Sequence, residues 1–93
     1  MGGEPLCDEN LFLTQMVISA VKEAHPNTIV YLWTGYVYED LPKRVQYKKI
    51  KTILSQVDVL IDGPYLHEQR DLTLPMRGSR NQRIIELDKS EFF

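Results

Sequence analysis

The run VDVLID, residues 57 to 62, is the feature that most constrains how this chain can fold. It is short, almost entirely apolar before its final aspartate, and closed by Gly63 and Pro64. Such a run is typical of a strand buried on both faces of a sheet. The run TIVYLW, residues 28 to 33, has the same character. Because doubly buried strands occur mainly in parallel sheets covered by helices, the two runs predict an α/β fold.

Segments with helical periodicity precede both predicted strands. Apolar residues recur at helical spacing over residues 11 to 24, where Asp8 is a candidate N-cap, and again over residues 45 to 57. A last strand-like run, RIIEL, covers residues 83 to 87. The order is therefore helix, strand, helix, strand, long loop, strand. We predict one α/β domain with a mostly parallel sheet over residues 1 to 93.

Two segments lack a sustained period. Residues 64 to 83 are rich in charge and contain Pro75 and Gly78, and a loop of that length is usually functional. Residues 88 to 93, DKSEFF, predict a flexible tail.

Composition excludes several classes of protein. The formal net charge of −2 removes the overall attraction on which nonspecific nucleic-acid and membrane binders rely. A single cysteine, Cys7, cannot form an intrachain disulfide or a thiolate cage, and His25 and His67 lack the paired spacing of a metal site. With no signal peptide and no apolar run of membrane-spanning length, we expect a cytoplasmic protein with no nucleic-acid partner, no membrane partner and no metal ligands of its own.

Three glycine-containing loops are expected to meet where the strands end. They are GGEP, TGY and DGPY, and ligands bind at the carboxyl ends of parallel strands. Glu4 could accept hydrogen bonds from an ammonium or hydroxyl group, although GGEP taken alone is more often a tight turn. Thr34 and Gly35 would stand beside a ligand, whereas the neighbouring Trp33 suits either a ligand or the core. Asp62 would orient a ligand or cap the following turn.

Arginines concentrate in the long loop. Arg77, Arg80 and Arg83, with Asn81 between them, form a candidate surface for an anion or a partner in an otherwise mildly acidic chain. Solvated surface charge is the alternative interpretation of the same residues. None of these patterns contains a nucleophile beside a base, so no residue of this chain is predicted to be catalytic.

Four motifs in register, GGEPL, YLWTGY, VDVLIDGPY and MRGSRNQRII, resemble those of the activating proteins of anaerobic ribonucleoside-triphosphate reductase. The resemblance implies a radical-SAM partial β/α barrel in which a CxxxCxxC loop binds a [4Fe-4S] cluster. Such an enzyme cleaves S-adenosylmethionine to a 5'-deoxyadenosyl radical, which takes hydrogen from a glycine of the reductase. The reductase would then be the partner of this protein.

The same resemblance assigns roles to the first residues. Gly2, Gly3 and Glu4 match the motif that contacts the amino group of S-adenosylmethionine, and Pro5 would shape that loop. The CxxxCxxC loop lies upstream of GGEP in the family, whereas this chain begins at GGEP. We therefore expect a C-terminal part of such an activase that holds no cluster and is inactive alone.

Two further expectations follow from the residues. A non-catalytic α/β module that docks an acidic partner or a nucleotide through its arginine-rich loop is the alternative function. In addition, the run at residues 28 to 33 has no charge in its middle. If its edge is unpaired, we expect it to pair with a second copy of the chain as a homodimer.

Overall fold

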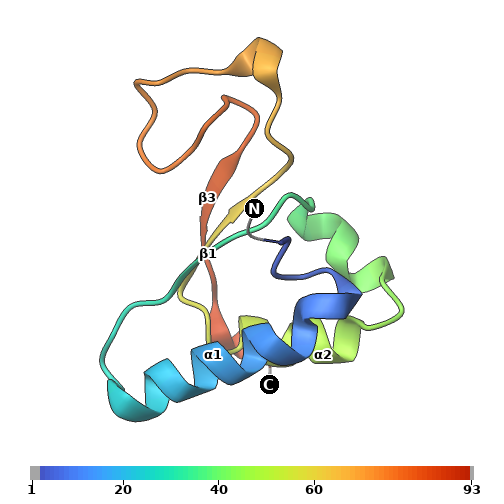
Figure 1. Cartoon of the computed structure of the whole chain (residues 1–93), viewed down its shortest axis with the longest axis vertical. Helices are drawn as coiled ribbons and strands as arrows, with labels where there is room; N and C mark the ends of the chain where they lie inside the picture. The colour runs from blue at the N-terminus through green and yellow to red at the C-terminus, as the bar shows by residue number, and fades with distance from the viewer. Residues whose placement is uncertain (1–2, 93) are drawn as a thin grey trace.

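The computed structural model describes residues 3 to 92. Its helices and strands follow the predicted order, which is therefore confirmed (Figure 1). They are α1 (Leu11–Ala24), β1 (Tyr31–Trp33), α2 (Tyr47–Leu54), β2 (Val59–Asp62) and β3 (Arg83–Glu86). Four short 3-10 helices complete the described part: η1 (Asp8–Asn10), η2 (Tyr38–Lys43), η3 (His67–Gln69) and η4 (Lys89–Phe92).

The sheet is mixed, with the order β1-β2-β3. β1 runs parallel to β2, with Tyr31 opposite Val59, whereas β3 runs antiparallel to β2, with Arg83 opposite Asp62. The prediction of a mostly parallel sheet was wrong for this last strand. The reason is the connection: η2 and α2 carry the chain back between the parallel strands, but the segment between β2 and β3 contains only the short helix η3 and loops straight back (Figure 1).

The central strand alone has the burial that the sequence predicted for two strands. Leu60 and Ile61 of β2 are fully buried. In β1, by contrast, Tyr31 and Trp33 are about half exposed and only Leu32 packs on the core. Among the described strands β1 lies at one edge of the sheet, where it has a neighbouring strand on one side only, and the face that carries Tyr31 and Trp33 is partly exposed. Pairing of this edge with a second copy stays a prediction.

One apolar core joins the helices to the sheet. Buried side chains of α1, η2, α2 and β2 form it, together with residues near both ends of the described chain. Its members include Leu6, Leu11, Ile18, Leu41, Ile50, Ile53, Leu54, Val57, Leu60 and Phe92. Four other apolar residues of α1, Phe12, Leu13, Met16 and Val17, are more than half exposed. No helix in the part of the chain that the structure describes is long and apolar enough to cross a membrane.

The start of α1 differs from the prediction. Asp8 lies in η1 and does not cap α1; its carboxylate accepts a hydrogen bond from Arg44 at 2.7 Å. The same guanidinium donates to the carbonyl of Leu6 at 3.2 Å and lies 4.4 Å above the ring of Tyr36. Arg44 therefore holds the N-terminal loop against the segment that follows β1.

The C-terminal residues contact the core. Phe92 is 7% exposed, and the ammonium of Lys89 donates to the carbonyl of Val57. Flexibility of residues 88 to 93 stays a prediction, as does the single-domain boundary.

The carboxylate of Asp58 links three segments at the start of β2. It accepts hydrogen bonds from the Val30 amide at 2.8 Å and from Lys22 at 3.0 Å, and Lys89 lies 3.7 Å away. Burial alone would raise the pKa of Asp58, but these hydrogen bonds and the two lysines together hold it below its ordinary value of 3.8.

This lowered pKa predicts an acid-sensitive contribution to stability. A carboxyl whose pKa falls on folding stabilises the protein above its unfolded pKa, and the contribution is lost as the pH falls through the folded value. We expect Asp58→Asn to cost about 1–2 kcal/mol at pH 7. Urea denaturation of both proteins at a series of pH values should give free energies of unfolding that converge below about pH 4. A difference that persists unchanged in acid would contradict this account.

Candidate functional site

Two of the predicted loops meet at the end of β1. The carboxylate of Glu4 accepts hydrogen bonds from the hydroxyl of Thr34 and the amide of Gly35, both at 2.6 Å, and from the Leu6 amide at 3.0 Å. The sequence motifs GGEP and TGY are therefore joined directly. A carboxylate offers about four acceptor positions, so Glu4 keeps room for one further donor beside these three.

The N-terminal loop is held in this position by its own backbone. The carbonyl of Glu4 accepts bonds from the Cys7 amide at 3.3 Å and from the side-chain amide of Asn10 at 3.0 Å. A side chain on Gly3 would begin 2.5 Å from that Asn10 amide, and one on Gly35 would begin 3.3 Å from the Glu4 carboxylate. Both glycines thus permit close approach at the site.

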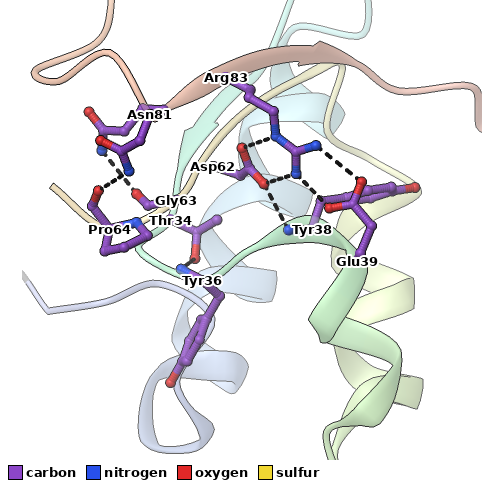
Figure 2. Close-up of polar contacts among 10 residues, drawn as sticks. Thr34, Tyr36, Tyr38, Glu39, Asp62, Gly63, Pro64, Asn81 and Arg83 are labelled. Carbon is purple, nitrogen blue, oxygen red and sulfur yellow. Dashed lines mark hydrogen bonds and ion pairs between the residues drawn. The ribbon is translucent and has the colours of Figure 1, made fainter. Parts of the chain in front are cut away.

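Thr34 connects this loop to the central strand. Its side chain is buried, and its amide donates to the carbonyl of Ile61 at 2.9 Å. Its hydroxyl accepts a bond from the Tyr36 amide at 3.2 Å (Figure 2), and the Tyr36 carbonyl accepts from Gly63 at 2.8 Å. The ends of β1 and β2 are therefore fixed relative to each other.

An open cavity of about 370 Å³ lies over these loops. Five of the predicted cofactor-binding residues line it, namely Gly3, Glu4, Pro5, Thr34 and Gly35, and Asp62 does not. The remaining prediction, Gly2, lies outside the described residues. Other lining residues come from β1 and from the loop after β2: Trp33, Gly63, Tyr65 and Gln82.

The sequence prediction of the site did not include four of these lining residues. The sequence of Trp33 and its neighbours suited either contact with a ligand or a place in the core. The side chain is 48% exposed, so it is not part of the core. Gly63 and Tyr65 belong to the DGPY loop, which the sequence places at a strand end, so their position gave a signal. Gln82 had none, because its place depends on how the long loop folds back.

Asp62 is buried and binds within the protein. Its carboxylate accepts from Arg83 Nε at 2.9 Å, from Arg83 Nη2 at 2.5 Å and from the Tyr38 amide at 2.8 Å (Figure 2). Arg83 also donates to Glu39 at 2.6 and 3.1 Å. Hydrogen bonds to Asp62 and Glu39 raise the pKa of Arg83, and the bond from Arg83 lowers the pKa of Glu39. Asp62 and Arg83 thus tie η2 to β3.

The amides in the arginine-rich loop also bind within it. Gln82 accepts from the amides of Gly78 and Ser79 at 2.9 and 3.2 Å and donates to the Gly63 carbonyl at 3.0 Å. Asn81 donates to the Pro64 carbonyl at 2.7 Å (Figure 2) and accepts from the Ser79 hydroxyl at 2.6 Å. These bonds close the loop onto the end of β2.

The two other arginines predicted to bind an anion do not line the cavity. Arg77 donates to the Gln82 carbonyl at 3.3 Å, while Arg80 is exposed and its backbone amide bonds to Gln69. With Arg83 bound to two carboxylates, the alternative of an anion-docking module rests on Arg77 and Arg80.

The residues of this chain do not suit an iron-sulfur cluster. Such clusters are held by several cysteine thiolates, and the chain has only Cys7. Within residues 3 to 92, no three His, Cys, Asp or Glu side chains gather in a way that could hold a metal ion.

Comparison with known proteins places the chain in a family. The model of the 4Fe-4S single cluster domain matches residues 1–85, so the chain belongs to that family.

Its curated relatives are named anaerobic ribonucleoside-triphosphate reductase-activating protein. The relative from Vibrio cholerae is 37% identical over 83 residues, which is 89% of this chain and 50% of the relative. The relative from Enterobacteria phage T4 is 38% identical, with 89% and 48% covered, and the relative from Escherichia coli K12 is 28% identical, with 92% and 53% covered. The chain thus spans about half the length of these relatives. No solved structure matches it significantly.

Proposed function

We propose that this chain is the S-adenosylmethionine-contacting part of a radical-SAM activase, and that the protein to which it belongs makes a glycyl radical on anaerobic ribonucleoside-triphosphate reductase in the cytoplasm. The observation that carries the proposal is the junction of Glu4 with Thr34 and Gly35 at the cavity over the strand ends. The names of the curated relatives support the choice of reductase.

The roles of the residues follow from their chemistry. Glu4 would accept a hydrogen bond from the ammonium of the cofactor with its remaining acceptor position, while Gly3 and Gly35 let a ligand approach the backbone. Asp62 does not line the cavity, so its role would be indirect: it would position η2 and β3. The cysteines that hold the cluster of such an activase would come from outside these residues.

Nuclear magnetic resonance tests cofactor binding by the chain itself. We expect S-adenosylmethionine, titrated into the millimolar range, to shift the amide signals of Gly35, Gly63 and Gln82 weakly but specifically. The amide of Val45, which is fully exposed and does not line the cavity, is the internal control. Unchanged spectra, or shifts spread away from the cavity, would refute the assignment of the site.

Activation needs a second experiment that supplies the cluster ligands. The chain can be joined to the part of the Vibrio cholerae relative that it does not match and assayed anaerobically with the reductase. We expect the joined protein to activate the reductase, the chain alone to be inactive, and Glu4→Ala to abolish activation. Val45→Ala is the matched control. Full activation by the Glu4→Ala protein would exclude the proposed role of Glu4.

A further inference from the structure

The cavity over the strand ends has a polar side and an aromatic side. Glu4, Thr34 and Gln82 provide carboxylate, hydroxyl and amide groups, whereas Trp33 and Tyr65 provide two large rings. Both rings lie at the surface, with exposed fractions of 48% and 51%. Aromatic rings left half exposed in a cavity offer flat apolar faces to a ligand.

The indole of Trp33 is held in place from outside the sheet. Its N–H donates to the carbonyl of Met76 at 2.7 Å, and its ring stacks with Tyr31, the centroids being 6.4 Å apart. Met76 has a φ of 61°, a left-handed conformation that strains a non-glycine residue. The tip of the long loop thus adopts a costly conformation where its backbone accepts the bond that orients Trp33.

The phenol of Tyr65 is held on the other side by a close contact with the backbone. A Cβ added to Gly78 would lie 2.9 Å from Cδ1 of the ring, so only glycine fits beneath it. The edge of the His67 ring lies beside it, with the centroids 6.5 Å apart. Gly78 is itself fixed by the Gln82 side chain at 2.9 Å. Both rings are therefore positioned before a ligand arrives, which limits the entropy lost on binding.

We propose that Trp33 and Tyr65 form the subsite for the planar heteroaromatic ring of a nucleoside-type ligand, whose charged end binds the polar side at Glu4. This subsite rests on the proposed function, because S-adenosylmethionine combines an adenine ring with an ammonium and a carboxylate. The two sides of the cavity then recognise different halves of one molecule, and each half can be tested separately.

Equilibrium dialysis with labelled adenosine and labelled methionine separates the two halves. Loss of a base-stacking aromatic weakens binding roughly fivefold to a hundredfold. We expect Trp33→Leu and Tyr65→Leu to weaken the binding of adenosine by that factor. The affinity for methionine should stay within about twofold of that of the unaltered protein. Trp33→Phe and Tyr65→Phe, which keep a ring, should retain most adenosine binding. Phe12→Leu, which changes an exposed aromatic of α1 that does not line this cavity, is the control.

A second measurement guards against variants that lose their fold. Trp33 is the only tryptophan of the chain, so its fluorescence in the unaltered protein should change with adenosine and not with methionine. Equal weakening by the leucine and phenylalanine variants with no fluorescence change would overturn the subsite. Binding of S-adenosylmethionine that is insensitive to both rings would overturn it while leaving the proposed function intact. Adenosine binding that depends on the rings, without binding of S-adenosylmethionine, would support the subsite and remove the cofactor assignment.

Discussion

Asp62→Ala is expected to lower the free energy of unfolding by about 3 kcal/mol, at the lower end of the range for breaking a buried ion pair because Arg83 is partly solvated. The substitution removes the acceptor for Arg83 Nε, Arg83 Nη2 and the Tyr38 amide. Among the carboxylates of residues 3 to 92, the Arg83 guanidinium would then keep only that of Glu39, which is exposed. Urea denaturation followed by circular dichroism measures the loss.

Glu39→Gln is the matched control for Asp62→Ala. Glu39 binds the same guanidinium but is 62% exposed, so its ion pair with Arg83 is weakened by solvent and contributes little to stability. We expect Glu39→Gln to leave the unfolding midpoint nearly unchanged. If the two variants were equally unstable, burial of Asp62 would not be what makes the pair important.

Glu4→Ala is expected to remove the candidate site and to destabilise the chain by about 1–3 kcal/mol, because it leaves three donors without their charged acceptor. The N-terminal loop would lose its bonds to Thr34 and Gly35 at the end of β1. The amide signals around the cavity should then no longer respond to S-adenosylmethionine. Nuclear magnetic resonance and thermal unfolding measure the two effects separately.

Thr34→Val is the control for Glu4→Ala. It removes one of the three hydrogen bonds to Glu4 and the acceptor of the Tyr36 amide, but it keeps the Glu4 carboxylate and the volume of the side chain at position 34. We therefore expect a smaller loss of stability and retained binding. A Thr34→Val protein that lost binding as completely as Glu4→Ala would show that the loop junction, and not the carboxylate, determines affinity.

Local sequence patterns were sufficient for the order of the elements. The helical periodicity over residues 45 to 57 predicted α2 because Ile50, Ile53 and Leu54 form one apolar face, and these three are buried. The apolar run before Gly63 predicted β2 because a short run without polar alternation is typical of a strand buried on both faces, and Leu60 and Ile61 are both buried. The meeting of GGEP with TGY could also be anticipated, since parallel strands end at one edge of the sheet.

Local patterns failed where the partner of a residue lies far along the chain. The run at residues 28 to 33 reads like the buried strand β2, yet it lies at the edge of the described sheet, where Tyr31 and Trp33 are partly exposed. Similarly, Asp8 reads as a helix cap, but Arg44, 36 residues away, takes its carboxylate.

The sequence by itself determined the α/β class, the order of helices and strands, and the glycine-rich loops that meet at the cavity, because burial and periodicity are properties of neighbouring residues. Tertiary structure alone decided the antiparallel direction of β3, the pairing of Asp62 with Arg83, and the placement of Gln82 at the cavity that Glu4 lines. Each of these depends on how the loop between β2 and β3 folds back. Hydrogen bonds between residues that are distant in the sequence determine that path.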